Sequence, residues 1–160
     1  MEQTGAMQIY LIRHAHAAEG DHDAARPLSA KGRKQIRAMV KFLHRSGRLQ
    51  TTEFWHSPLV RARDTAALLG QGLGRKARLV EVSGMEPYAN PVGMAQKLRK
   101  LRRPVAVVGH EPHLSELATL LLVGRAVTPV ITLKKCAVVA LERKDEGWAL
   151  RWQVSPKEIR

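Results

Sequence analysis

The chain has 160 residues, about the length of one domain and too short for an enzyme with a separate cofactor domain. Hydrophobic residues make up 44% and charged residues 26%, so a buried core is expected and wholesale disorder is not. The single cysteine excludes an intramolecular disulfide and a cysteine metal cluster. An aromatic content of 4% argues against a stacking platform for single-stranded nucleic acid.

The net charge is the unusual feature of the composition. The chain has 27 Lys and Arg residues but only 14 Asp and Glu residues, which gives a net charge of +13. Such a surplus concerns partners more than fold, and it suits nucleic acid, anionic lipid, or an acidic or phosphorylated substrate. The basic residues are spread over segments 29–45, 97–103 and 134–135. A spread charge is typical of a solvated face; the alternative is attraction of an acidic phosphoprotein or polyanion. No nucleic-acid motif accompanies it.

The N-terminus lacks the pattern of an export signal, because residues 1–7 contain Glu2 and no basic residue. No stretch approaches the ~20 apolar residues that a membrane span needs. We therefore expect a soluble, cytoplasmic protein that is one domain over residues 1–160, with a flexible N-terminal segment 1–7.

The predicted elements alternate between strands and helices, which indicates an α/β three-layer sandwich with a mainly parallel central sheet flanked by helices. The strand predictions rest on short apolar runs, and the helix predictions on apolar periodicity and capping residues. In chain order they are a strand over 8–12, a helix from Ser29 to about Arg45, a strand over 53–56, a helix over 61–73 closed by glycines 70, 72 and 74, a strand over 78–82, a helix from Asn90-Pro91 to Leu101, a strand over 104–108, a helix opened by Glu111-Pro112, and a closing hairpin of 137–141 with 150–154.

Polar residues follow three of these strands, where ligands bind in such folds. Arg13 and His14 end the first strand, Arg61 follows the second, and His110 follows the fourth. The guanidinium group of arginine can donate two parallel hydrogen bonds to the oxygens of a phosphoryl group. A neutral imidazole can attack phosphorus and form a covalent intermediate. The helix starting near Pro112 would add free N–H groups beside His110. The pattern predicts a phosphoryl-transfer site.

Each feature also has an ordinary explanation. An Arg-His pair after a strand is more often a solvated edge than a catalytic pair, and a Gly-His pair at a strand end is equally weak alone. The combination in chain order, with each feature at a different strand end, is much more specific.

With these residues, the sequence resembles the histidine phosphatase superfamily, and most closely the small bacterial phosphohistidine phosphatases of the SixA type. The resemblance covers nearly the whole chain, from about Met7 to Pro156. The matching segments, in order, are 12–14, 26–32, 57–62 with Thr65-Ala66, 108–112 and 152–156.

The resemblance implies a phosphoglycerate mutase-like fold and a phosphatase that needs no metal or other cofactor. It also implies that His14 accepts the phosphoryl group and that Arg13, Arg61 and His110 surround the phosphoryl oxygens.

Two positions depart from the family pattern. The glycine of the family's Arg-His-Gly motif is Ala15 here, which narrows the room beside the nucleophile. Larger members carry a glutamate that protonates an alcohol leaving group. Glu86 lies in roughly that region, and the small branch commonly does without the acid.

Four further residues are candidates for substrate binding: Arg26, His16, Glu86 and His113. Arg26 either folds back to the phosphate or forms a salt bridge with Asp21 or Asp23. His113, in the helix after His110, could line the pocket.

His16 forms a His-x-His pair with His14, which suggests a metal site, but the following Asp21-His22 lies too far along for the metallo-hydrolase pattern. We expect no metal ligands. Ser57 is interpreted as a turn residue, and Arg63 as solvent-exposed.

The predicted activity is that of a metal-independent phosphatase with a covalent phosphohistidine intermediate. Its expected substrate is phosphohistidine on a protein, such as a histidine-containing phosphotransfer domain, or a related phosphoramidate or phosphomonoester. The alternatives are a small-molecule phosphomonoesterase of the same fold, a non-catalytic phosphate- or polyanion-binding domain, and a basic nucleic-acid binder supported only by the charge. We expect no specific nucleic acid and no membrane among the partners.

Overall fold

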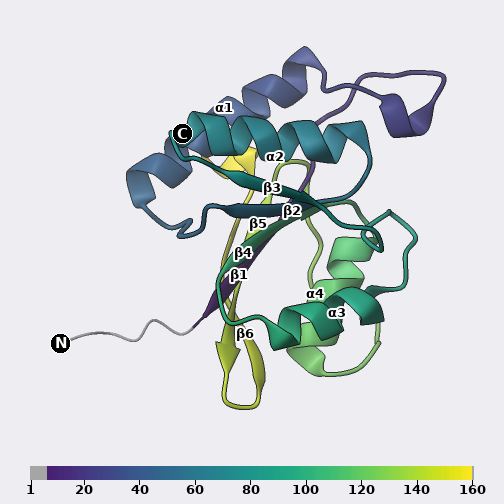
Figure 1. Cartoon of the computed structure of the whole chain (residues 1–160), viewed down its shortest axis with the longest axis vertical. Helices are drawn as coiled ribbons and strands as arrows, with labels where there is room; N and C mark the ends of the chain where they lie inside the picture. The colour runs from purple at the N-terminus through teal and green to yellow at the C-terminus, as the bar shows by residue number, and fades with distance from the viewer. Residues whose placement is uncertain (1–6, 160) are drawn as a thin grey trace.

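Six strands form one mixed sheet in the computed structural model, which describes residues 7–159 (Figure 1). Their order across the sheet is β3-β2-β4-β1-β5-β6. The first four are mutually parallel, whereas β5 is antiparallel to β1 and β6 is antiparallel to β5. The strands are β1 (Gln8–Arg13), β2 (Glu53–His56), β3 (Arg78–Glu81), β4 (Val105–Gly109), β5 (Val138–Lys144) and β6 (Gly147–Val154).

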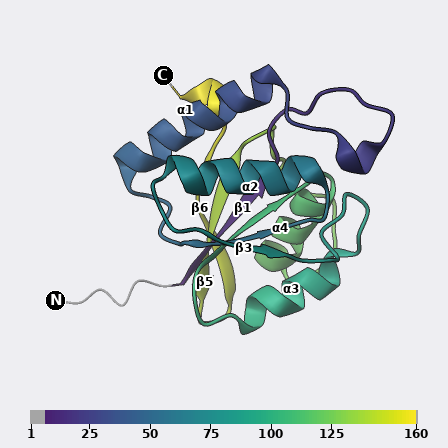
Figure 2. The same cartoon turned by 45° about the horizontal axis from the view of Figure 1, so that its top comes forward.

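Helices cover both faces of the sheet, which confirms the predicted three-layer sandwich (Figures 1 and 2). One face packs against α1 (Ala30–Ser46) and α2 (Val60–Gly72), and the other against α3 (Pro91–Lys100) and α4 (His113–Val123). Short 3₁₀ turns, η1 (Asp23–Ala25) and η2 (Pro156–Glu158), complete the structure.

Strand β1 lies at the centre and is buried on both sides. Tyr10 and Ile12 belong to the core under α1 and α2, whereas Ile9 and Leu11 belong to the core under α3 and α4. Alternate side chains therefore enter different cores, which explains why the strand reads as a continuous apolar run. Burying each such side chain stabilises the fold by about 1.5–3 kcal/mol.

The predicted helix starts agree with the structure where a side chain caps the helix. The Ser29 hydroxyl accepts a hydrogen bond from the Gly32 N–H at 3.0 Å, and Asn90 accepts one from Val92 N–H before Pro91. These caps satisfy N–H groups that the helix itself leaves unpaired.

The end of α2 differs from the prediction. Gly70 lies inside the helix and Gly72 is its last residue, and close packing at both positions leaves no room for a side chain. A Cβ atom would lie 2.5 Å from Ala77 Cβ at position 70 and 2.7 Å from Val40 Cγ2 at position 72. Only Gly74, with a φ of +67°, has the backbone of a helix-ending glycine.

The N-terminal segment expected to be flexible falls mostly outside the described residues, which begin at Met7. The carbonyl of Met7 accepts a hydrogen bond from Arg143 N–H, so this residue is held against the sheet. Within residues 7–159 no helix is long and apolar enough to cross a membrane.

Candidate active site

Three neighbouring strand ends meet at one edge of the sheet. Because β1 pairs with β4 and β4 pairs with β2, the residues that follow these strands are brought together. His14 N–H donates to Gly109 O at 2.9 Å, and Ser57 N–H donates to Val108 O at 3.3 Å. The rings of His14 and His110 consequently lie 5.0 Å apart, centre to centre.

The contacts of His14 fix which of its ring nitrogens is free. Nδ1 lies 2.7 Å from Ala15 O, and a carbonyl oxygen can only accept, so Nδ1 carries the proton. In the neutral ring Nε2 then holds the lone pair, and it has no hydrogen-bond partner among the described residues. The ring is buried, with 7% of the residue exposed. His14 is therefore held as the tautomer that a nucleophile attacking through Nε2 requires.

The backbone after His14 is tied to the helix that carries Arg61. Ala15 N–H donates to the Thr65 hydroxyl at 3.0 Å, and that hydroxyl donates to Arg61 O at 2.7 Å. Ala15 is fully buried, so its methyl group fills the space that a glycine would leave beside the nucleophile.

Burial and neighbouring cations keep His14 uncharged. Burial is the largest cause that lowers the pKa of His14 to about 4, and the charges of Arg61, Arg13 and Lys135 act in the same direction. The hydrogen bond to Ala15 O opposes them. At neutral pH the imidazole is therefore unprotonated at Nε2.

Ser57 orients His110, a role that the sequence interpretation missed. The Ser57 hydroxyl lies 2.5 Å from His110 Nε2, and it accepts a hydrogen bond from Leu59 N–H. The hydroxyl has no other acceptor among the described residues, so we assign its proton to a hydrogen bond with Nε2, and this assignment puts the proton of His110 on Nδ1. This Nδ1–H is buried and has no partner among the described residues. Burial, followed by the charges of His14 and Arg61, lowers the pKa of His110 to about 3.

Arg13 also holds a buried donor that is unused. Its terminal nitrogen donates to Leu133 O at 2.9 Å, whereas its Nε has no partner among residues 7–159. A buried donor without a partner costs free energy, so two of them beside His14 suggest a place for an anion.

Arg61 is buried at the start of α2, and its guanidinium contacts the η1 turn. It donates to Asp23 O at 2.9 Å and to the Asp23 carboxylate at 3.3 Å. Asp23 also forms a salt bridge with Arg26 at 3.1 Å, and these bonds hold the pKa of Asp23 below its ordinary value. The sequence left open whether Arg26 contacts the phosphate or forms a salt bridge with Asp21 or Asp23, and the structure shows the salt bridge with Asp23. Arg63 is exposed, as expected.

Lys135 is a further cation at this edge that the sequence interpretation counted only as surface charge. It precedes Cys136, whose N–H donates to the carbonyl oxygens of Arg13 and His14 at 3.0 and 3.2 Å. Desolvation, followed by the charges of Arg13, Arg26 and Lys31, lowers the pKa of Lys135. Lys135 reaches the site because the turn before β5 is hydrogen-bonded to the end of β1, and hydrophobic periodicity does not reveal such a contact.

Some of the N–H groups expected to be free at the start of α4 are bonded, whereas those of Glu111 and His113 have no hydrogen-bond partner among the described residues. Leu114 N–H bonds to His110 O, and Ser115 N–H bonds to the Glu111 carboxylate at 2.8 Å. Glu111 also accepts from Leu133 N–H, so it braces the loop that holds Arg13. The Glu111 side chain thus occupies one N–H group of the first turn of α4.

The other candidates lie at the margin of the site. His16 Nδ1 lies 2.6 Å from the Ser29 hydroxyl at the cap of α1. The Glu86 carboxylate accepts from Gly84 N–H at 3.1 and 3.2 Å within its own loop. His113 is fully buried, and burial lowers its pKa against the opposing charges of Glu86 and Glu111.

No group of three or more His, Cys, Asp or Glu side chains between residues 7 and 159 is placed to hold a metal ion.

Comparison with known proteins identifies the fold. The phosphohistidine phosphatase SixA in complex with tungstate superimposes with a TM-score of 0.85 at 24% identity, covering 95% of this chain and 99% of that one. A SixA-type protein of Agrobacterium tumefaciens gives 0.76 at 21% identity, covering 94% and 99%. A phosphoserine phosphatase mutant of Entamoeba histolytica in complex with phosphoserine gives 0.69 at 14% identity, covering 94% and 98%.

The sequence comparisons are consistent with this fold. Curated protein sequences give no significant match. Residues 9–85, however, match the family model of the histidine phosphatase superfamily (branch 1), and this segment contains Arg13, His14 and Arg61. The chain is therefore similar to the histidine phosphatase superfamily over residues 9–85, and its fold is similar to that of the SixA structures.

Proposed function

We propose that this protein hydrolyses phosphohistidine on proteins, or a related phosphoramidate, through a covalent phosphohistidine formed on His14. The observation that carries the proposal is the free Nε2 of a buried, neutral His14 beside two buried donors without partners, Arg13 Nε and His110 Nδ1. The alternative of a phosphate-binding domain without catalysis gives no reason for holding His14 in this tautomer.

In the first step, the Nε2 lone pair of His14 attacks phosphorus while the bond from phosphorus to the leaving nitrogen breaks. The electron pair of that bond goes to the leaving imidazole, which takes a proton from solvent. The phosphorylated ring of His14 gains positive charge, and its Nδ1–H bond to Ala15 O stabilises that charge. Arg13, Arg61 and His110 donate to the phosphoryl oxygens as their charge shifts.

In the second step, a water molecule attacks the phosphorus of the phosphohistidine. The bond between phosphorus and Nε2 breaks, and its electrons return to the ring. Inorganic phosphate leaves, and the proton of the attacking water goes to phosphate or solvent. His14 is restored as the neutral Nδ1–H tautomer.

The leaving group favours a P–N bond as substrate. An alkoxide needs a placed proton donor, whereas imidazole, whose conjugate acid has a pKa near neutrality, needs little help. Glu86 is the candidate donor, but its carboxylate is bonded to Gly84 N–H. We propose that Glu86 plays no part in the chemistry.

The test compares phosphohistidine, an aryl phosphate and a simple alkyl phosphate on the wild type and on Glu86→Gln, with and without a chelator. The expected rates fall in that order, and neither Glu86→Gln nor the chelator changes them. Fast cleavage of the alkyl phosphate that Glu86→Gln slows by a factor on the order of 10² to 10⁴ would instead establish Glu86 as general acid. Loss of activity with the chelator, restored by zinc or manganese, would establish a metal enzyme.

A small-molecule phosphomonoesterase is the second candidate. It is favoured by the phosphoserine complex of the Entamoeba histolytica protein, which shares this fold. In that case phosphoserine would be cleaved at least as fast as phosphohistidine.

A further inference from the structure

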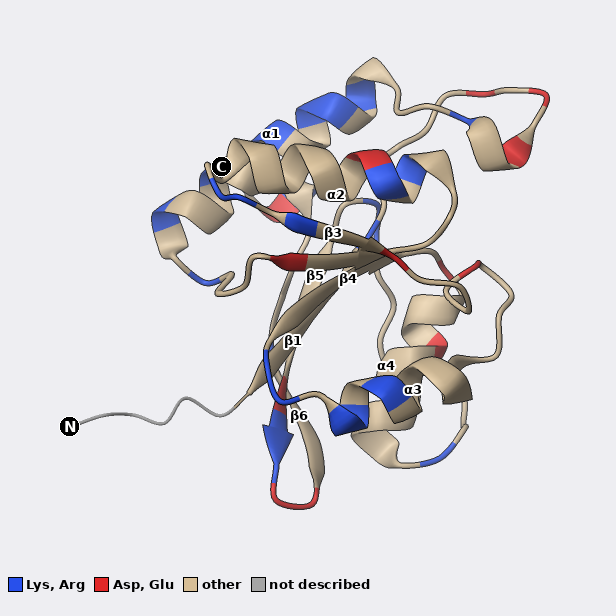
Figure 3. Ribbon diagram, viewed as in Figure 1, with Lys and Arg blue, Asp and Glu red and all other residues tan. Residues whose placement is uncertain are grey.

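Helix α1 carries an unbalanced charge along its exposed side. Its six basic residues are all exposed, and the helix contains no Asp or Glu. None of the six takes part in an ion pair within residues 7–159. Figure 3 shows basic residues along the length of the helix. They are Lys31, Arg33, Lys34, Arg37, Lys41 and Arg45.

This arrangement does not serve the stability of the helix. Arg33, Arg37, Lys41 and Arg45 follow one another at intervals of four residues, so each lies beside the next on the helix surface. Like charges at this spacing destabilise a helix by about 0.2–0.5 kcal/mol per pair. A surface without compensating acids therefore points to a partner that supplies them.

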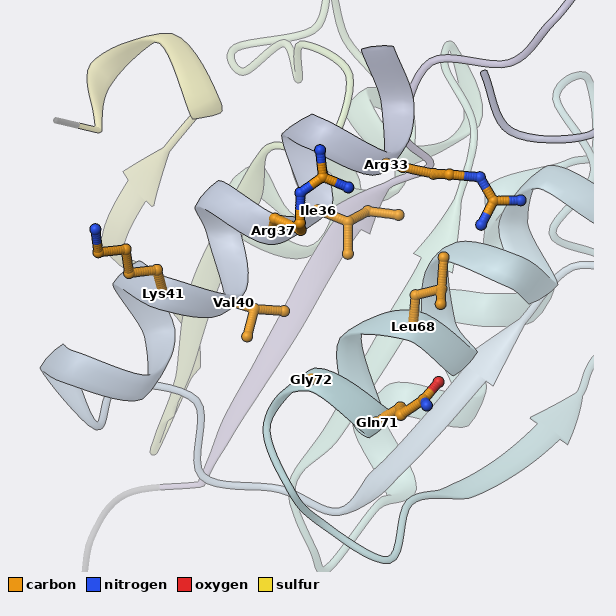
Figure 4. Close-up of a pocket in the computed structure, with 8 residues that line it drawn as sticks. All are labelled: Arg33, Ile36, Arg37, Val40, Lys41, Leu68, Gln71 and Gly72. Atoms are coloured by element: carbon orange, nitrogen blue, oxygen red, sulfur yellow. The ribbon is translucent and has the colours of Figure 1, made fainter. Parts of the chain in front are cut away.

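A groove of about 530 Å³ lies between α1 and α2 on the same side. Its rim carries Arg33, Arg37 and Lys41, and its lining includes the apolar side chains of Ile36, Val40 and Leu68 (Figure 4). Val40 and Leu68 are only partly buried, so apolar surface remains open to solvent under a row of cations.

The groove lies between the two helices whose first turns reach the active-site edge. Both helices follow parallel strands and start at that edge, α1 from the Ser29 that bonds His16 and α2 with Arg61 in its first turn. Desolvation, followed by the charges of Lys135 and Lys31, lowers the pKa of His16. Basic residues therefore also lie near His16, beside the start of α1. A molecule bound in the groove reaches His14 only if it also extends along α1 past its first turn.

We propose that the α1–α2 groove, defined by Arg33, Ile36, Arg37, Val40, Lys41 and Leu68, docks an acidic amphipathic helix of the phosphorylated protein substrate. The apolar lining matches the apolar face of such a helix, and its carboxylates match the basic rim. The net charge of +13 argues against a second copy of this chain as the occupant, because two such chains repel each other. The inference rests on the proposed phosphatase function.

The test uses two charge-reversed variants with equal net charge. One carries Arg33→Glu, Arg37→Glu and Lys41→Glu on α1; the control carries Lys97→Glu, Arg99→Glu and Lys100→Glu on α3, on the opposite face of the sheet. All six side chains are exposed, so both variants are expected to fold. Circular dichroism and thermal melting verify this.

The substrates are phosphoramidate and two helical peptides that carry one phosphohistidine, with Glu or Gln on the polar face. With the Glu peptide at low salt, the α1 variant should raise KM by about 10-fold, whereas the α3 variant stays near the wild type. Added salt should reduce the difference. Phosphoramidate turnover should be the same in the α3 variant as in the wild type. In both of these proteins the KM for the Gln peptide should be higher than the KM for the Glu peptide.

Equal effects of the two variants, or no effect of the α1 variant, would overturn docking in the groove while leaving the phosphatase function intact. If the wild type hydrolyses none of the substrates, the proposed function fails instead. Binding of the unphosphorylated Glu peptide, measured by fluorescence anisotropy, then decides the docking proposal by the same comparison. Stronger α1-dependent binding of duplex DNA or anionic vesicles than of the peptide would also overturn it.

Discussion

At the scale of single residues, a serine hydroxyl determines the state of His110. Because Ser57 donates to Nε2, the proton of His110 stays on Nδ1, the buried donor without a partner. Ser57→Ala should lower kcat by about 10- to 100-fold, because the ring loses both its anchor and its preferred tautomer. Nitrogen NMR of His110 should show the tautomer change in the same variant, with the fold unchanged. An unaltered kcat and an unaltered tautomer would remove Ser57 from this role.

The charge of Lys135 should be visible in the pH dependence of the reaction. The pKa of His14, lowered to about 4, places the acid limb of kcat/KM well below the 6.5 of an ordinary histidine. Lys135 is one of the charges that lower this pKa, so Lys135→Met should raise it and move the acid limb to higher pH. Lys134→Met is the matched control, because the neighbouring Lys134 is exposed. An aryl phosphate serves as substrate, since its own ionisation is the same for each enzyme.

The result that would contradict this account is an acid limb that does not move in Lys135→Met, or that moves equally in Lys134→Met. Either would mean that Lys135 acts on the bound substrate or not at all, rather than on His14.

At the scale of elements, the start of α1 touches the chain that leaves the active site. A Cβ atom at Gly32 would lie 2.1 Å from His16 O, too close for any real contact. Gly32→Ala should therefore destabilise the protein by about 1–3 kcal/mol and raise KM by displacing the His16 loop. Gly93→Ala in α3 is the control: nothing lies near its Cβ, and it should stabilise by about 0.5–1 kcal/mol. Equal denaturation midpoints for the two variants would disprove the close contact.

The elements whose signals are local could be predicted from the sequence. Strand β1 is an apolar run in the sequence because it is buried on both faces. The capping residues Ser29 and Asn90 predict where α1 and α3 begin. Gly70 and Gly72 were misread, because a glycine that permits close packing looks the same in sequence as one that ends a helix.

The candidate site was predictable only in part. His14, Arg61 and His110 follow strands, and strand order brings such residues together. Asp23, Ser57, Thr65 and Lys135 reach the site through turns and tertiary hydrogen bonds, which no periodicity encodes. Ser57 and Thr65 fall within the segments that match the family, but their residue types are also common in loops with no function, so residue type alone assigns none of the four a role.

At the scale of the whole molecule, the active-site histidines should make stability depend on pH. Their folded pKa values, about 4 for His14 and about 3 for His110, lie below the unfolded value near 6.5. The unfolded chain therefore binds more protons as pH falls below about 6.5, so stability decreases through this window and is highest above it. At pH 5 each histidine costs about 2 kcal/mol.

Urea denaturation at pH 7.5 and pH 5 measures this cost. The double variant His14→Gln, His110→Asn should lose much less stability between the two values than the wild type does. An equal loss in both proteins would mean that other groups carry the acid sensitivity.

The central claim is a phosphoryl group bonded to Nε2 of His14, and the most direct measurement is to trap that adduct. Wild-type protein is quenched in base during turnover of a ³²P-labelled phosphohistidine substrate, beside His14→Asn as control. The account predicts an acid-labile, base-stable phosphohistidine, linked through Nε2 because Nδ1–H is held by Ala15 O, and absent from the variant. An adduct on Nδ1, an acid-stable adduct, or turnover by folded His14→Asn at the wild-type rate would contradict it.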